Sequence, residues 1–113
     1  MSKRIMLVTG VDGQVELLND RVIIHRSGLW NLVKYGMNST REIPLGAISE
    51  IAFKESSALW LGYIEFIRSG RAADELKKKN YSKVTFKKMQ NAQFVRLKEK
   101  MFELLDQHSR QRQ

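Results

Sequence analysis

The spacing of the hydrophobic residues changes once along this chain, near Asn91, and this change limits the fold more than any other feature. Before that point, short apolar runs alternate with polar residues between turns, a pattern typical of antiparallel strands. After it, apolar residues recur every three or four positions, as on one face of an α-helix with Asn91 as its N-cap. These residues are Phe94, Leu97, Met101, Leu104 and Leu105, with Phe102 widening the stripe. The sequence therefore predicts a mainly β domain with one C-terminal helix.

The strands are predicted from the segments between turn residues. Val15 and Leu17 begin one strand, and residues 21–26 return as its hairpin partner. Asn19 and Asp20 separate them, because both residue types tolerate the left-handed backbone of a tight hairpin turn. Residues 29–35 either extend this second strand or form another, and further strand segments are expected at 41–45, 48–53, 59–67 and 83–87. Pro44 has no amide hydrogen for a sheet and is expected at the edge or end of a strand.

The length and composition of the chain favour one domain. Its 113 residues can bury a single core but are too few for two cores of ordinary size. We expect one domain at 1–106 and a frayed polar tail at 107–113. The absence of cysteine excludes disulfides and a thiolate nucleophile. No apolar run is long enough for a membrane helix or a signal-peptide core, so a cytoplasmic location is expected.

Residues that could perform catalysis or bind a metal do not form a motif. The two histidines, His25 and His108, are far apart in the sequence, and no cluster of Asp, His and Cys residues has metal-ligand spacing. The seven glycines are scattered among turns instead of preceding a helix, so no phosphate-binding loop is predicted. We expect no enzymatic activity, no cofactor and no metal.

The chain is strongly basic, with a net charge of +8 that favours phosphates, acidic proteins or anionic lipids as partners. The densest basic segment surrounds Tyr81. Its members are Lys77, Lys78, Lys79, Lys83, Lys87 and Lys88. If 83–87 is a half-buried strand, Lys83 and Lys87 share its outward face. These lysines are candidates for binding an anion, and the alternative is that they solubilise a loop and protect a strand edge.

Two clusters of aromatic and aliphatic residues offer a different kind of binding residue. Trp30 follows Leu29, and Trp60 lies between Leu59 and Leu61. Tryptophan is enriched at the centres of protein interfaces, but a small β domain also needs large side chains in its core. Core burial is the favoured interpretation. Exposure of Trp30 or Trp60 for binding to a partner is the alternative.

Several groups of apolar and turn residues, distributed over most of the chain, have the spacing of a known class of domain. They comprise Gly13, Ile43-Pro44-Leu45 with Ile48 and Ile51, Gly62-Tyr63-Ile64-Glu65-Phe66, Val84-Thr85-Phe86, and the helix from Phe94 to Leu105. Together with the order of the predicted elements, they resemble the bacterial PH-like domain families, small proteins mostly of unknown function. The resemblance implies a strongly bent antiparallel sheet or partly open barrel of seven strands, capped by the C-terminal helix. Such positions indicate a fold and not a function.

PH-like folds bind lipid head groups, peptides or other proteins, and in bacteria they often serve assembly. Members that bind phosphoinositides carry basic residues on both sides of the first hairpin turn. The resemblance places that turn at Asn19-Asp20, where Arg21 is the nearby cation, and this disfavours the phosphoinositide mode. We therefore expect a non-enzymatic PH-like module that binds protein, either as a homo-oligomer or with another chain. The alternative is a binder of nucleic acid or anionic lipid through the lysine-rich face.

Overall fold

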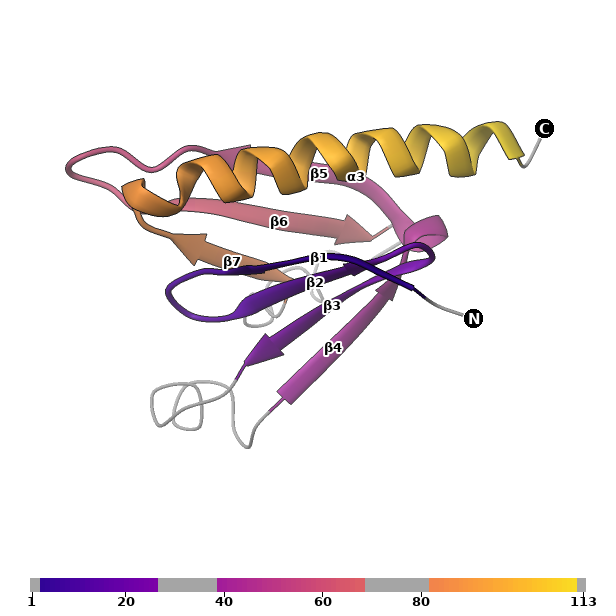
Figure 1. The fold of residues 1–113 in the computed structure, drawn as a ribbon, viewed down its shortest axis with the longest axis horizontal. Coiled ribbons are helices and arrows are strands. Elements are labelled where there is room, and N and C mark those ends of the chain that lie inside the picture. Colours follow the sequence, from indigo (N-terminus) through magenta and orange to yellow (C-terminus); the bar gives the residue numbers. More distant parts are fainter. Residues whose placement is uncertain (1–2, 27–38, 69–81, 112–113) are drawn as a thin grey trace.

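The computed structural model describes residues 3–26, 39–68 and 82–111, which form two antiparallel sheets and one α-helix (Figure 1). The first sheet has the order β1-β2-β3-β4, with β1 at Arg4–Thr9, β2 at Gln14–Leu18, β3 at Arg21–Arg26 and β4 at Ser39–Pro44. The second has the order β5-β6-β7, with β5 at Ile48–Lys54, β6 at Gly62–Arg68 and β7 at Lys83–Phe86. The 3-10 turns η1 and η2 span Leu45–Ala47 and Lys88–Gln90, and the helix α3 spans Asn91–Gln111. The predicted mainly β domain with a C-terminal helix is confirmed, and the described strands do not close into a barrel.

The alternation of side chains along the strands builds the core between the sheets. In the β2–β3 hairpin, Val15 lies opposite Ile24 and Leu17 opposite Val22, and all four are buried. The turn between these strands is Asn19-Asp20, as the sequence predicted. The same alternation buries Val84 and Phe86 on β7 and Ile64 and Phe66 on β6. The inward side chains of both sheets belong to one cluster of buried apolar residues, so the two sheets share a single apolar interior.

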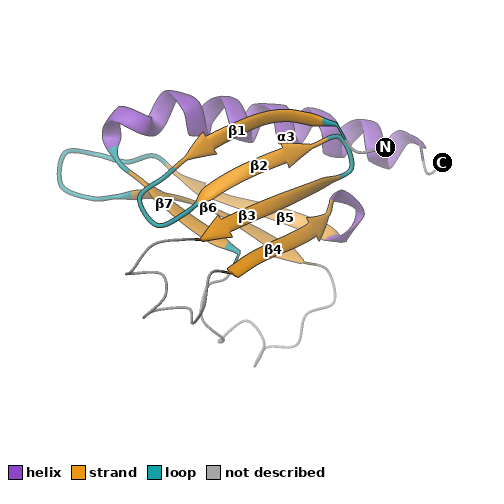
Figure 2. Cartoon of the chain, turned by 60° about the horizontal axis from the view of Figure 1, so that its bottom comes forward, coloured by secondary structure: helices purple, strands orange, loops and turns teal. Residues whose placement is uncertain are grey.

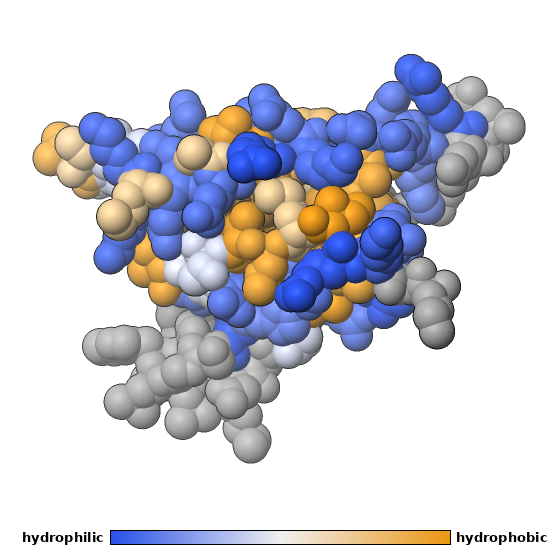
Figure 3. Space-filling view, in the orientation of Figure 1, coloured by the Kyte–Doolittle hydropathy of each residue, from blue (hydrophilic) through white to orange (hydrophobic). Residues whose placement is uncertain are grey.

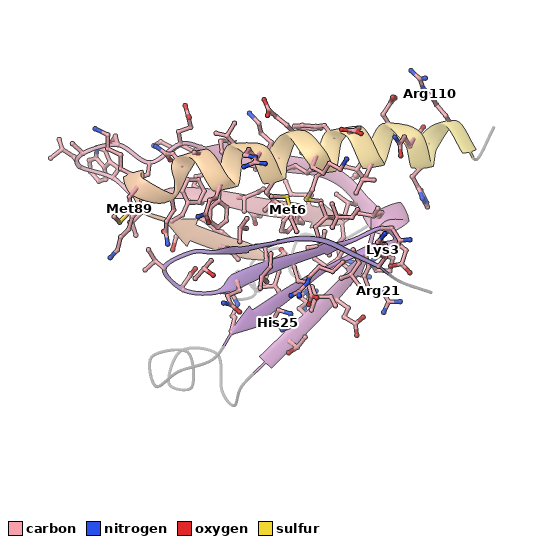
Figure 4. The ribbon with its side chains drawn as sticks, viewed as in Figure 1. Lys3, Met6, Arg21, His25, Met89 and Arg110 are labelled. Atoms are coloured by element: carbon pink, nitrogen blue, oxygen red, sulfur yellow. The ribbon has the colours of Figure 1, made fainter. Side chains whose placement is uncertain are left out.

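The helix α3 lies along one side of the two sheets, beside β1 and η1 (Figure 2). Phe94, Leu97 and Met101 are fully buried, and the ring of Phe94 stacks on Phe86 with centroids 4.2 Å apart. Met6 of β1 packs against the same core from below the helix (Figure 4). The helix therefore closes the apolar interior along this side, as its stripe of hydrophobic residues predicted.

Three details at the helix differ from the sequence prediction. Phe102 is 50% exposed, so it lies outside the buried stripe. The helix also continues to Gln111 through most of the segment expected to fray, because Gln and Arg are good helix formers and Arg110 pairs with Asp106 at 3.3 Å. Asn91 is the first helical residue instead of the N-cap, and the backbone N–H of Lys87 donates to Oε1 of Gln90 at 2.8 Å.

The strand expected at 59–67 begins only at Gly62, and the residues before it form part of the β5–β6 loop. The register explains this difference, because the last β5 residue, Lys54, lies opposite Tyr63 and leaves no partner strand for earlier residues. A Cβ atom at Gly62 would lie 2.5 Å from the backbone oxygen of Lys54 and the backbone nitrogen of Ser56. Glycine is therefore needed where the chain re-enters the sheet.

A second correction concerns the hairpins. The first hairpin is β1–β2, closed by a turn in which the Gly10 N–H donates to the Gly13 carbonyl at 2.8 Å. Asn19-Asp20 is therefore the second hairpin turn and not the first. The prediction missed this because β1 has a mixed burial pattern instead of a clean alternation. Residues 9–14, around the first turn, contain no lysine or arginine.

The two sheets meet at a corner that is built around a buried arginine. Arg26, at the end of β3, donates from Nη1 to the Asp12 carbonyl at 3.1 Å and from Nη2 to the Lys83 carbonyl. Its guanidinium also lies 3.7 Å from the Asp12 carboxylate. That carboxylate accepts the Thr85 N–H at 2.9 Å, while the Val11 N–H donates to the Thr85 carbonyl at 2.8 Å. The β1–β2 turn is thus bound to both β3 and β7.

Replacement of Arg26 should weaken this junction. We expect Arg26→Ala to lower the free energy of unfolding by about 2–4 kcal/mol, because buried carbonyl oxygens lose charged donors. The exposed Arg4 of β1 offers a matched control, and Arg4→Ala should change stability by less than about 0.5 kcal/mol. Urea denaturation followed by circular dichroism measures both. Equal effects of the two substitutions would show that the junction does not depend on Arg26.

Candidate binding site at the β5–β6 loop

The β5–β6 loop carries consecutive large apolar side chains that face solvent. Leu59, Trp60 and Leu61 are 85%, 68% and 49% exposed, and we call these three residues the apolar loop. The loop lies at one end of the long axis of the molecule, where Figure 3 shows hydrophobic atoms at the surface. Met89, 84% exposed in η2, lies at the same end (Figure 4). The favoured prediction that Trp60 belongs to the core is wrong, because Trp60 precedes the first residue of β6 and its side chain faces solvent.

Hydrogen bonds within the loop fix its backbone. The carbonyl of Trp60 accepts from the hydroxyl of Ser56 and from the backbone N–H of Ser57, both at 2.9 Å. The N–H of Trp60 donates to the hydroxyl of Ser57 at 3.2 Å. Both backbone polar groups of Trp60 are therefore satisfied within the turn, and its side chain is held outward. Serines at consecutive positions suit such a turn because their hydroxyls bond readily to nearby backbone groups.

Asn91 fastens this loop to the start of α3. Its Oδ1 accepts the N–H of Ser56 at 2.8 Å, and its Nδ2 donates to the carbonyl of Ser56 at 2.9 Å. Ser56 is buried, so these bonds are shielded from water. Sequence reasoning missed this role because Asn91 and Ser56 are 35 residues apart and neither belongs to a motif that pairs them. Asn91 thus sets the position of the loop on the core.

Two of the predicted lysines lie beside the apolar loop. Lys87 and Lys88 line an open surface depression together with residues 56–61. Lys83 lies at the opposite end of β7, with its ammonium 4.4 Å from the centre of the Tyr63 ring. The remaining candidates, Trp30, Lys77, Lys78 and Lys79, fall outside the described residues, as does the strand segment expected at 29–35. The structure therefore unites Trp60, Lys87 and Lys88, which the sequence assigned to two competing clusters, and separates Lys83 from them.

Other polar groups of the described residues are paired on the surface of the first sheet. His25 Nε2 lies 2.8 Å from Glu16 Oε1. Arg21 contacts Asp20 at 3.2 Å and Glu42 at 2.6 Å, and these carboxylates, Asp20 foremost, raise the pKa of the guanidinium above its ordinary value. The cation beside the Asn19-Asp20 turn is thus neutralised by its neighbours. Within the described ranges, no group of three or more His, Cys, Asp or Glu residues could hold a metal ion.

Comparison of the chain with protein-family models, with curated proteins and with solved structures found no match. Among the helices that the structure describes, none combines the length and the apolar character needed to cross a membrane. Function is therefore inferred from the residues of the site alone. The apolar loop, Met89, Lys87 and Lys88 offer apolar area and two ammonium groups, which suit binding to an apolar surface with an acidic rim.

Loss of the Asn91 side chain should release the loop. We expect Asn91→Ala to speed amide hydrogen exchange at residues 56–61 and to lower stability by about 1–3 kcal/mol, because the buried Ser56 backbone loses two partners. Gln93→Ala, an exposed change in the same helical turn, should leave both quantities nearly unchanged. Exchange measured by mass spectrometry checks the result. Unaltered exchange in the Asn91 variant would mean that the turn is held by its serines alone.

Proposed function

We propose that this chain is a non-enzymatic binding module of PH-like architecture that binds a protein through the apolar loop. The PH-like part of the proposal is supported by the four-stranded and three-stranded antiparallel sheets and by the C-terminal helix along one side. The binding part is carried by one observation: three consecutive large apolar side chains are exposed on a turn whose backbone is hydrogen bonded.

Such a turn favours association for two physical reasons. A tryptophan removes about 150–250 Å² from water when it is buried, which makes it a strong contributor to interface energy. A loop already held by hydrogen bonds also loses little conformational entropy on binding. The bonds from Asn91 to Ser56 and from Ser56 to Trp60 supply this preorganisation. The apolar loop is thus ready to bind without first folding.

The chemistry of the loop favours a protein over a nucleic acid. Binding of single strands relies on several aromatic rings along a basic groove. Here Trp60 is the one aromatic residue among those lining the depression, and its neighbours Leu59 and Leu61 are aliphatic. Aliphatic side chains match the apolar side chains of a protein and offer nothing to phosphates. Lys87 and Lys88 add preference for an acidic rim on that protein.

A photo-crosslinking residue in place of Leu59 tests this function in cells that make the protein. We expect it to capture defined protein species, either this chain or another, and we expect Trp60→Ala in the same chain to reduce the yield severalfold. The reduction follows because truncation of a central aromatic weakens an interface strongly.

The matched control places the same crosslinker at Gln93, which is exposed on α3. It should capture few of these species. If positions 59 and 93 yield the same adducts, or if Trp60→Ala changes nothing, the loop is not a protein-binding site.

A second candidate function, binding to an anionic membrane surface, is favoured by the two lysines in the same depression as Trp60. Tryptophan and leucine beside lysine are common in segments that insert at the membrane interface. This mode differs from recognition of phosphoinositides at the first hairpin turn, because residues 9–14 carry no cation there. Protein binding is placed first since, among the described residues that line the depression, apolar side chains outnumber the two lysines.

Vesicle sedimentation separates the two functions. Membrane binding predicts that the chain sediments with phosphatidylcholine vesicles only when phosphatidylserine is added, and that Lys87→Gln with Lys88→Gln reduces the bound fraction severalfold. Lys98→Gln with Lys100→Gln removes the same charge from α3 and should matter less. If both double variants bind the vesicles equally, vesicle binding depends on the net charge of the chain and not on the depression beside the apolar loop. Absence of binding would exclude the membrane function.

A further inference from the structure

We propose that the partner of the apolar loop is a second copy of this chain, which receives the loop in a groove at the opposite end of the molecule. This inference rests on the proposed function and names the partner for it. We call the receiving surface the C-terminal groove. It is lined by Leu45, Gly46, Ile48, Ser49, Glu50, Ile51, Phe102, Leu105, His108 and Ser109.

The C-terminal groove has an apolar floor. Ile48 and Ile51 of β5 are buried beneath it, and Leu105 of α3 is partly buried against the core. Phe102, half-exposed on α3, provides an aromatic side chain at its rim. Among the described residues, Phe102 is one of the few large apolar residues whose side chain is exposed. The groove therefore presents apolar area on two elements, as a receptor for Leu and Trp side chains requires.

The charges at the two surfaces are opposite. The charged residues among those lining the depression at the apolar loop are Lys87 and Lys88. Among the residues lining the C-terminal groove, Glu50 is the one that belongs to the Asp, Glu, Lys and Arg types, and it is exposed. Insertion of the loop would bring an ammonium group toward this carboxylate at the rim. Such an arrangement favours the loop-to-groove orientation over contact between two like-charged loops.

The positions of the surfaces determine the kind of assembly. The β5–β6 loop and the C-terminal end of α3, marked by Arg110, lie at opposite ends of the long axis (Figures 1 and 4). One chain cannot fill its own groove, and each copy keeps one loop and one groove for its neighbours. The contact is therefore heterologous, and it generates an open chain of copies or a ring if the rotation closes. Because a single loop in a groove buries little area, assembly should be weak and should increase with protein concentration.

Two variants, each lacking one half of the contact, test the proposal. Trp60→Ala removes the inserted side chain, and Phe102→Glu places a carboxylate on the rim of the groove without opening a core cavity. Each variant alone should self-associate at least roughly tenfold more weakly than the natural chain, the loss expected for a central aromatic residue. Their mixture retains one intact loop and one intact groove, so it should form a complex limited to two copies.

Sedimentation velocity of the purified chains over a concentration series measures these outcomes. Gln93→Glu introduces the same charge elsewhere on α3 and should associate like the natural chain, which controls for added charge. Circular dichroism confirms that each variant folds. If a variant fails to fold, charge reversal replaces it: Glu50→Lys and the pair Lys87→Glu with Lys88→Glu should each weaken association, and mixing them should restore it.

Three results would overturn the proposal, and they are distinguishable from failure of the proposed function. Self-association that Trp60→Ala abolishes but Phe102→Glu spares would indicate contact between two loops. A chain that stays monomeric at all concentrations, while Leu59 still crosslinks to another protein, would show that the loop binds a different partner. Association that neither variant changes would place the contact between copies elsewhere on the molecule.

Discussion

Within the described part of the chain, a buried cation, Arg26, holds the corner where the two sheets meet. Its guanidinium binds the carbonyl oxygens of Asp12 and Lys83, and Lys83 is 57 residues from Arg26 in the sequence. An apolar side chain of similar size would leave these oxygens without donors, which is costly away from water. The carboxylate of Asp12 binds the backbone of Thr85 as well, so the β1–β2 turn positions Arg26 and β7 together. This corner replaces the continuous strand pairing that would otherwise connect the sheets.

The position of the apolar loop follows from the same core. Phe86 at the end of β7 stacks on Phe94, which fixes where α3 begins. The start of α3 places Asn91 against Ser56, and Ser56 in turn bonds to the carbonyl of Trp60. Each step is a buried or partly buried contact, so the loop backbone is tied to the core although its apolar side chains are exposed. A surface loop tied to the core in this way is suited to recognition, because its shape does not have to be created on binding.

The sequence indicated those features that depend on local periodicity. Period-two alternation revealed β3 and β7, and the 3.6-residue stripe revealed α3, because burial on one face repeats with the geometry of each element. It misplaced the start of β6, since Leu59, Trp60 and Leu61 have high strand propensity but lack a partner strand, which only the register shows. The contacts of Arg26 and Asn91 join distant segments and leave no local pattern. The site was therefore predicted as separate residues, Trp60 and the lysines, and not as one surface.

The net positive charge of the chain determines what a contact through the apolar loop has to overcome. A chain with a formal charge of +8 repels its own copies, so association without a specific contact is opposed. A contact between copies has to gain its free energy locally, from apolar area and from opposite charges at short range. Apolar area and opposite charges are both present, at opposite ends of the molecule. One end carries the apolar loop with Lys87 and Lys88, and the other carries the C-terminal groove with Glu50. Salt screens the repulsion between copies over distances beyond about 10 Å, whereas burial of the Trp60 side chain in the groove of a neighbour is unaffected by salt. Moderate salt should therefore leave this assembly intact. It should release a partner that is held by charge alone.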